Sequence, residues 1–177
     1  NPPVVAPVFA HPENHGGQKY VVLDGANRST ALIQLRLPAM VVQVVEYDSP
    51  EVRLSTWNHV VCEIEVDELL RDVAAIPGSI LKDTLTLYAR SDLARREILA
   101  YLDCADGRAL AVHSEAHDLA TRTEILNLLV NTYKERSRLY RANTDTLADV
   151  ADFYPNAAAL VVFPHFEPVE LQTFARD

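Results

Sequence analysis

Residues 20–35, YVVLDGANRSTALIQL, change from a strand pattern to a helix pattern within a few positions. Aromatic and β-branched residues open the stretch and favour a strand, whereas apolar residues recur at helical spacing from Ser29 onward. An Asp, a Gly, an Asn and an Arg lie at the change of direction. The stretch therefore predicts a strand over residues 19–23 that turns tightly into a helix ended by Pro38.

The turn at Gly25 has the chemistry of an anion site. The start of a helix leaves backbone N–H groups without internal partners and concentrates partial positive charge, and glycine lets the backbone approach a ligand closely. Arg28 adds a planar fork of donors for phosphate oxygens, and the hydroxyls of Ser29 and Thr30 can donate to the same anion. Asp24 would instead suit a divalent metal carried on a phosphate, or a substrate hydroxyl. The combination predicts a site for a nucleotide with its metal.

A purely structural interpretation of the same residues stays open. Asp24 and Gly25 could form a turn, Asn27 could cap the helix, and Arg28 could lie on the solvent face, because short glycine-containing motifs recur by chance. The ligand site makes a more specific demand. It predicts that the N–H groups of residues 27–29 point into one concavity.

The first half of the chain indicates an α/β arrangement. Residues 40–47, MVVQVVEY, form a nearly continuous apolar run, which is typical of a strand covered on both faces. We therefore expect this strand to be central. Further strands are expected over residues 4–9 and in a short segment that ends at Trp57, and a helix is expected over residues 66–76.

The second half is organised differently. The turn residues 105–107, Ala-Asp-Gly, join two apolar runs and predict a hairpin. Asp118 is placed to cap a long helix that reaches about residue 141. A shorter helix over residues 144–153, a strand over residues 159–163 and a helix opened by Glu167 and Pro168 complete the expected elements. We place a domain boundary near Pro77, although no linker segment divides the chain there.

The composition restricts the class of protein. Hydrophobic residues make up 49% of the 177 residues, which is enough for at least one core. The formal net charge of −9 would repel a phosphate backbone, so a nucleic-acid partner is disfavoured. Cys62 and Cys104 are far apart and in no metal-ligand spacing, which suits reduced thiols in a cytoplasmic protein. No apolar run approaches the about 20 residues of a membrane span, so no membrane association is expected.

Several segments together resemble the free L-serine kinases of the ParB/sulfiredoxin-like superfamily, which are known from archaea and from siderophore gene clusters. The segments are VVLDGANRSTAL, VRLSTWNHVV, the opening NPPVVAP and the later YPNAAALVVFPHFEP. The resemblance covers most of the chain. It implies an α/β (α+β) fold, with a ParB/sulfiredoxin-like nucleotide-binding core over residues 1–77 and a smaller α/β subdomain over residues 78–177.

The resemblance also implies an activity, the transfer of a phosphoryl group from ADP or ATP, with Mg²⁺, to the hydroxyl of free L-serine. Asp24 would orient the serine hydroxyl or the metal, and Trp57 would line the amino-acid pocket. The residues implied to bind the nucleotide are Gly25, Ala26, Asn27, Arg28, Ser29 and Thr30.

His59 is a further catalytic candidate, because an imidazole next to a pocket-lining Trp57 could touch the phosphate or the substrate carboxylate. Its alternative is a satisfied histidine in the core or at its rim. Asn27 stands where many relatives have His, which removes a titratable group but keeps a donor. The general base of the family, a Glu before the first strand, and a Thr-Arg-His-like segment after the last helix are expected to lie outside these 177 residues.

Two other functions use a turn of this kind. A ParB-like nucleotide-binding transcriptional regulator or switch could use the same turn, but it would need a helix-turn-helix or a basic clamp. A sulfiredoxin-type reductase needs a Cys in the turn, where this chain has Ala26, and is rejected. His113 and His117 have the spacing of two metal ligands on a helix, but no third ligand accompanies them, so no metal site is assigned.

Overall fold

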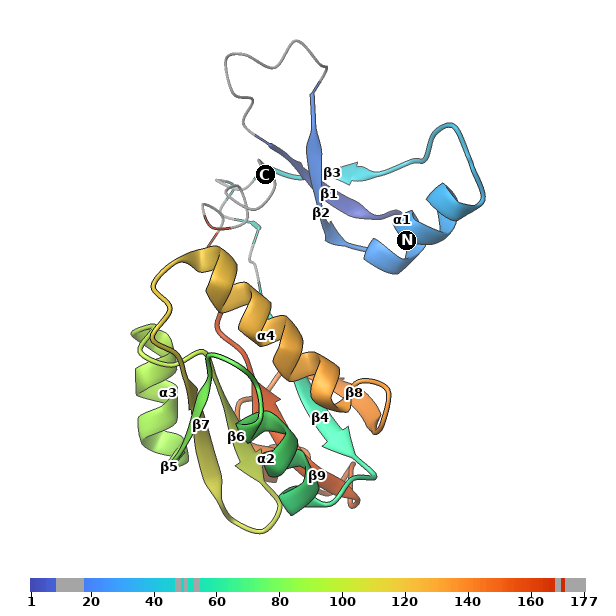
Figure 1. Ribbon diagram of the computed structural model, residues 1–177. Helices are drawn as coiled ribbons and strands as arrows, with labels where there is room; N and C mark the ends of the chain where they lie inside the picture. The colour runs from blue at the N-terminus through green and yellow to red at the C-terminus, as the bar shows by residue number, and fades with distance from the viewer. Residues whose placement is uncertain (9–17, 47–48, 50, 53–54, 168–169, 171–177) are drawn as a thin grey trace. The chain divides into compact units, whose positions relative to one another are not determined.

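The computed structural model describes residues 1–8, 18–46, 49, 51–52, 55–167 and 170. The chain forms two compact units. Unit 1 comprises Asn1–Leu54 with Phe166–Asp177, and unit 2 comprises Ser55–His165. Each unit has its own sheet, so the protein has a mixed α+β architecture (Figure 1).

Unit 1 is built on a small sheet with the strand order β2-β1-β3. The central strand β1 (Val4–Pro7) pairs antiparallel with β2 (Tyr20–Asp24) and parallel with β3 (Gln43–Val44). Helix α1 (Ala26–Gln34) follows β2 after a single residue, as the sequence predicts. The strand expected over residues 4–9 is therefore confirmed as far as Pro7; Phe9 lies outside the described residues.

The prediction of a central strand over residues 40–47 is wrong. Among residues 40–46, which the structure describes, the strand β3 covers only Gln43 and Val44, at the edge of the sheet, and Val41 is 82% exposed. The central place belongs to β1, whose Val5 and Ala6 are buried. An apolar run shows that a segment can be buried, but the pairing partners decide which strand is covered.

Unit 2 contains a six-stranded antiparallel sheet with the order β5-β7-β6-β9-β4-β8. Its strands are β4 (Asn58–Cys62), β5 (Ile80–Thr84), β6 (Ala100–Cys104), β7 (Ala109–His113), β8 (Arg138–Ala142) and β9 (Ala157–Val162). The β6–β7 hairpin turns at Gly107, as predicted, and the predicted strand over residues 159–163 corresponds to β9.

Helices lie on both faces of this sheet. Its helical elements are α2 (Val66–Ala74), α3 (Thr86–Ala94), α4 (Leu119–Tyr133) and the short 3₁₀ helix η1 (Leu147–Asp149). Helices α2 and α4 lie together on one face, in front of the strands in Figure 1. On the other face, Val60 and Cys62 of β4 belong to a core cluster with Ala89 and Leu93 of α3. Both faces of the central strands are thereby buried.

Two helix predictions in this unit are partly wrong. Asp118 caps α4 by accepting a hydrogen bond from the Thr121 N–H at 2.8 Å, as predicted, but the helix ends at Tyr133. Residues 138–141, expected to end this helix, instead lie in β8, which pairs with β4. The helix expected over residues 144–153 is reduced to η1. Over residues 138–142, long-range pairing with β4 overrides local helical periodicity.

The short strand before residue 58 also differs from expectation, because β4 begins after Trp57 instead of ending there. Since β4 pairs with β8 and β9, the described contacts divide the chain after Leu54. Residue 77, where the sequence suggests a boundary, lies between α2 and β5 within unit 2. The helix expected to open at Glu167 and Pro168 lies mostly outside the described residues.

Candidate functional site

The turn between β2 and α1 is built around Gly25. This residue is the N-cap of α1 and has φ of 89°, a left-handed conformation that favours glycine. The first backbone hydrogen bond of the helix runs from the Ser29 N–H to the Gly25 carbonyl at 2.9 Å. The N–H groups that precede this bond belong to Ala26, Asn27 and Arg28. The prediction is therefore wrong for the Ser29 N–H, which bonds within the helix, and stays a prediction for Asn27 and Arg28.

Close packing also favours glycine at this turn. A Cβ atom added to Gly25 would lie 2.9 Å from Nη2 of Arg28 and 3.0 Å from Cα of Pro3. Distances this short force a neighbour to move. The backbone at Pro3, just before β1, and the Arg28 guanidinium thus converge on the residue that starts the helix.

Arg28 is bound within its own unit. Its Nη2 lies 2.8 Å from Oδ2 of Asp24, and its Nη1 donates to the carbonyl of Asn1 and, at 3.3 Å, to that of Pro2. The Arg28 and Asp24 side chains remain 41% and 69% exposed, so solvent or a ligand can reach both. A phosphate that binds Arg28 has to compete with these partners.

The Ser29 side chain is the buried polar group of this turn. Ser29 is only 8% exposed, and among the described atoms its Oγ has no hydrogen-bond partner. Buried hydroxyls are normally hydrogen-bonded, so the Ser29 hydroxyl is available to a ligand group that reaches it. Asn27 and Thr30 are exposed. The turn therefore has exposed hydrogen-bond donors at Asn27 and Thr30 and a buried donor at Ser29.

The fit of Mg²⁺ to this turn depends on one carboxylate. Asp24 is exposed and uses Oδ2 to bind Arg28. Within the described part of the chain, no three His, Cys, Asp or Glu side chains gather into a metal site. Mg²⁺ is commonly held by one or two carboxylates together with substrate phosphates. The exposed Asp24 carboxylate is therefore the group at this turn that a metal carried on a nucleotide could reach.

Trp57 and His59 belong to unit 2, whereas residues 24–30 belong to unit 1. Trp57 directly precedes β4 and is 52% exposed. His59 lies within β4, where its Nδ1 is 2.8 Å from the hydroxyl of Tyr133. Its ring makes edge contacts with Tyr133, at 5.9 Å between centroids, and with Phe163, at 4.9 Å.

These surroundings determine the charge of His59. Desolvation by burial, and secondly the positive charge of Arg141, lower the pKa of His59 to about 4. The imidazole is therefore neutral at pH 7. It could contact a phosphate as a neutral donor or acceptor, but not as a cation.

A cavity in unit 2 was missed by the sequence analysis. Its polar residues include Arg90 of α3, and no element was predicted over residues 80–94. The sequence contains one helical signal here, because the apolar residues Ala89 and Leu93 are four positions apart. The structure buries both. The exposed Leu87 and Tyr88 obscure this pattern, since they spread apolar residues around the helix.

Comparison with known proteins gives a likeness of fold. No protein-family model matches the chain, and no curated protein matches it in sequence. A conserved hypothetical protein from Pyrococcus furiosus is similar in structure, with a TM-score of 0.73 and 14% identity over 99% of this chain and 69% of that chain. A free serine kinase in complex with AMP gives a TM-score of 0.68 and 15% identity, over 99% of this chain and 67% of that chain.

A variant of a free serine kinase, in which one glutamate is replaced by alanine, is similar as well. Its complex with ADP gives a TM-score of 0.66 and 15% identity, again over 99% of this chain and 67% of that chain. The chain therefore has the fold of these kinases across nearly all of its length. Among the helices that the described residues form, none combines the length and apolar character that crossing a membrane requires.

Proposed function

We propose that the protein is a nucleotide-dependent kinase that transfers a phosphoryl group from ADP or ATP to the hydroxyl of free L-serine, giving O-phospho-L-serine. The observation that carries the proposal is the left-handed Gly25 at the start of α1, with the first-turn N–H groups and Arg28 beside it. The fold supports the proposal, because similar structures are free serine kinases in complex with AMP or ADP.

In this proposal, residues 25–30 hold the phosphates of the nucleotide. The N–H groups of Ala26, Asn27 and Arg28 donate to phosphate oxygens at the positive end of the α1 dipole. The Arg28 guanidinium exchanges Asp24 for a phosphate, to which it can donate two parallel hydrogen bonds. The hydroxyls of Ser29 and Thr30 supply further donors.

When a phosphate replaces Asp24 at Arg28, the Asp24 carboxylate becomes available to the acceptor or the metal. An unpaired Asp24 can accept the hydrogen of the serine hydroxyl or bind the metal, and either action positions the acceptor for in-line attack. Mg²⁺, when bound, would neutralise charge on the phosphates. Trp57 lines the amino-acid pocket, and His59, neutral at pH 7, assists as a donor or acceptor to the substrate.

The test is a product assay on the full-length protein with magnesium, L-serine and either ADP or ATP. We expect a phosphomonoester signal in the phosphorus NMR spectrum that depends on serine. Asp24→Asn and Trp57→Ala should each lower turnover while leaving nucleotide binding nearly intact, because these residues position the acceptor.

A nucleotide-binding regulator without kinase activity is the second candidate, since the same turn could serve a nucleotide-gated switch. It predicts nucleotide binding but no serine-dependent product with either nucleotide. That result, obtained with a folded full-length sample, would replace the kinase by the switch. The net charge of −9 disfavours direct DNA binding by this chain.

A further inference from the structure

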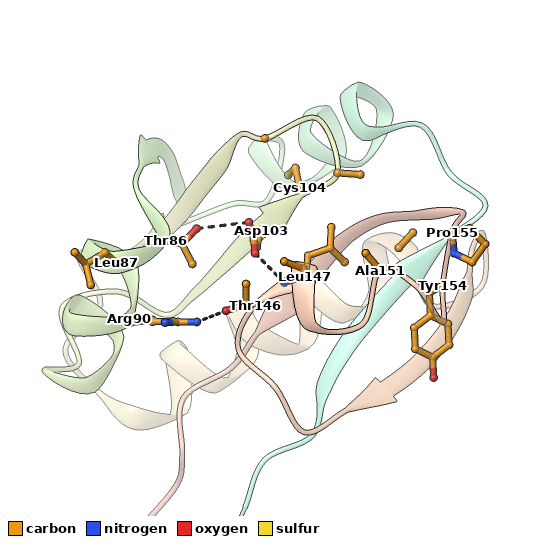
Figure 2. Close-up of a pocket in the computed structure, with 14 residues that line it drawn as sticks. Thr86, Leu87, Arg90, Asp103, Cys104, Thr146, Leu147, Ala151, Tyr154 and Pro155 are labelled. Atoms are coloured by element: carbon orange, nitrogen blue, oxygen red, sulfur yellow. Dashed lines mark hydrogen bonds between the residues drawn. The ribbon is translucent and has the colours of Figure 1, made fainter.

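Unit 2 contains a cavity of about 540 Å³. It is bounded by the start of α3, by the β6–β7 turn and by the segment that includes η1 (Figure 2). Its volume lies within the range of small-molecule sites, which are clefts of about 300–1,000 Å³ with a few placed polar groups. None of its lining residues belongs to the turn at residues 24–30.

The two ends of the cavity differ in chemistry. Arg90, Asp103 and Thr146 lie toward one end in Figure 2, and Ala151, Tyr154 and Pro155 lie toward the other. The polar end also receives the start of α3. The N–H groups of Thr86 and Leu87 precede the first hydrogen bonds of that helix, which begin with Tyr88 and Ala89.

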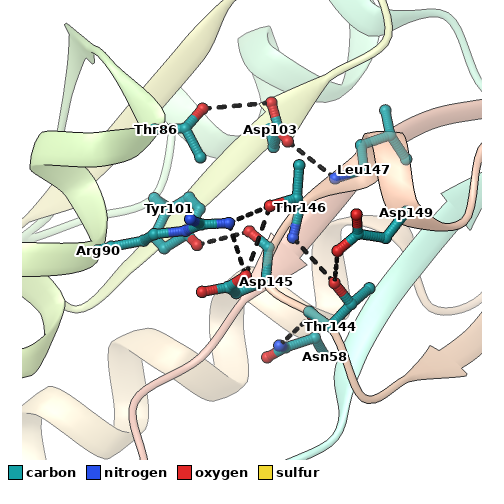
Figure 3. Close-up of polar contacts among 10 residues, drawn as sticks. All are labelled: Asn58, Thr86, Arg90, Tyr101, Asp103, Thr144, Asp145, Thr146, Leu147 and Asp149. Atoms are coloured by element: carbon teal, nitrogen blue, oxygen red, sulfur yellow. Dashed lines mark hydrogen bonds and ion pairs between the residues drawn. The ribbon is translucent and has the colours of Figure 1, made fainter.

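A hydrogen-bond network holds the polar end in place (Figure 3). Nη2 of Arg90 donates to Oδ1 of Asp145 at 2.7 Å and to the hydroxyl of Thr146. Oδ2 of Asp103 accepts from the Leu147 N–H at 2.8 Å, and the Tyr101 hydroxyl donates to the Asp145 carbonyl at 2.7 Å. The segment before η1 is thereby tied to α3 and β6, so the polar groups are positioned before any ligand arrives.

These groups keep hydrogen-bonding capacity. A guanidinium has five N–H donors. The described bonds of Arg90 to Asp145 and Thr146 both use Nη2, and the Tyr101 hydroxyl is a further hydrogen-bonding neighbour of Arg90. A carboxylate has about four acceptor positions, of which Asp103 uses one at 2.8 Å and a second for the more distant Thr86 hydroxyl at 3.5 Å. A cation and an anion are thus both able to accept a ligand partner.

The charge of the lining restricts the ligand. Among the described residues that line the cavity, Arg90 and Asp103 carry the charges, one of each sign. Arg90 is already paired with Asp145 at 2.7 Å, so a ligand carboxylate has to compete with that carboxylate. A phosphate or a dicarboxylate would in addition meet the repulsion of Asp103, and a simple cation would gain nothing from Arg90. A molecule with one carboxylate, one ammonium group and an apolar body matches both charges and the apolar end.

We propose that this cavity binds a free α-amino acid with an apolar side chain. Its carboxylate pairs with Arg90 and the first N–H groups of α3, its ammonium group pairs with Asp103, and its side chain packs against Leu147, Ala151 and Tyr154. The binding is non-covalent. Cys104 also lines the cavity, but burial, and secondly Asp106, raise the pKa of its thiol to about 12, so no thiolate is available.

The inference is independent of the proposed kinase activity, because every residue in it belongs to unit 2 and none is assigned to nucleotide or serine binding. The probes are L-phenylalanine and two analogues that each lack one charged end, 2-phenylethylamine and 3-phenylpropanoate. Titration calorimetry on the full chain, without nucleotide, should show binding of L-phenylalanine. Each analogue should bind with an affinity about tenfold or more below that of L-phenylalanine, because each lacks one charge-assisted hydrogen bond.

A filling variant locates the site. Ala151 is exposed at the apolar end, so Ala151→Phe should occupy the cavity without disturbing the core and should abolish binding of L-phenylalanine. The matched control is Ala120→Phe, at an exposed position of α4 that does not line the cavity, and it should bind as the unmodified protein does. Circular dichroism checks that both variants are folded.

Three results would overturn the inference. They are the absence of binding by all three probes, equal affinity for L-phenylalanine and both analogues, and unchanged binding in Ala151→Phe. The last result would place the amino acid elsewhere on the chain. Serine phosphorylation is measured separately, so a failure here leaves the proposed function unaffected, and a failure of the kinase assay leaves this inference unaffected.

Discussion

Arg28 lies one helical turn after Asp24, and its Nη2 is 2.8 Å from the Asp24 carboxylate. The two side chains therefore neutralise each other at the place where the proposed nucleotide site needs a cation. Because both are substantially exposed, the pair contributes only about 0–1 kcal/mol to stability. A phosphate that accepts two hydrogen bonds from Arg28 can displace Asp24 at small cost.

The first prediction concerns Arg28 itself. Arg28→Ala should weaken nucleotide binding by about 1.5–3 kcal/mol, the range for hydrogen bonds to a charged group, because a principal phosphate donor is lost. The melting temperature without ligand should change little, since the ion pair is exposed. Calorimetric titration with ADP measures the first effect and thermal unfolding the second. The control is Arg36→Ala, an exposed arginine of the same unit; equal affinity of Arg28→Ala and the control would reject the nucleotide site.

The second prediction separates the charge of Asp24 from its position. Asp24→Asn removes the ionic partner of Arg28 and frees the guanidinium, so nucleotide affinity measured without magnesium should be equal to or higher than that of the unmodified protein. Turnover of serine should nevertheless fall, because the amide is a poorer acceptor and metal ligand. A loss of nucleotide affinity in this variant would show that Asp24 holds the nucleotide rather than the acceptor.

The third prediction uses two glycines with similar backbone angles. Gly25 has φ of 89° and Gly107 has φ of 87°, but a Cβ on Gly107 would meet nothing within 4 Å. Gly25→Ala should destabilise the protein by about 1–3 kcal/mol through backbone strain and weaken nucleotide binding as Arg28 shifts. Gly107→Ala should lower stability through the same backbone strain but should leave nucleotide binding unchanged. Denaturant unfolding measures the loss of stability in each variant, and ADP titration measures nucleotide binding. Unchanged nucleotide binding in Gly25→Ala would show that the packing of Arg28 against Gly25 does not matter for the nucleotide.

The fourth prediction follows from the aromatic surroundings of His59. Burial lowers its pKa from 6.5 to about 4, so between these pH values the unfolded chain binds the proton more readily than the folded protein. The contribution of His59 to stability is therefore complete above pH 6.5 and is lost as the pH falls toward 4. His59→Gln should flatten the acid side of the stability profile, measured by thermal unfolding. His165→Gln, at an exposed position, serves as the control; an unchanged profile in His59→Gln would contradict the assignment.

The fifth prediction tests a buried polar link in the sheet of unit 2. Nδ2 of Asn58 donates to the Thr144 carbonyl at 2.7 Å, and its Oδ1 accepts from the Phe163 N–H at 3.0 Å. Asn58→Leu would leave both backbone groups unpaired and should cost about 2–5 kcal/mol. Asn127→Leu, on the exposed side of α4, should have little effect. Denaturant unfolding compares the two, and equal stabilities would show that water replaces the lost bonds.

The sequence by itself determined those features whose signals are local. The strand-to-helix turn at Gly25, the β6–β7 hairpin and the Asp118 cap each depend on residues a few positions apart, and each is found where it was predicted. The amphipathic helix α2 is found within the predicted range for the same reason. The likeness of fold to free serine kinases was also expected from short segments of sequence.

Only the tertiary structure decided which partner each segment has. Residues 138–142 continue a helical pattern, but pairing with β4 makes them a strand, because a ladder of long-range hydrogen bonds outweighs a weak local preference. The same dependence on distant partners places Arg90 beside Asp145, and His59 beside Tyr133. Contacts between residues tens of positions apart leave no periodic signal, so the cavity of unit 2 and the neutral state of His59 were apparent only once the chain was folded.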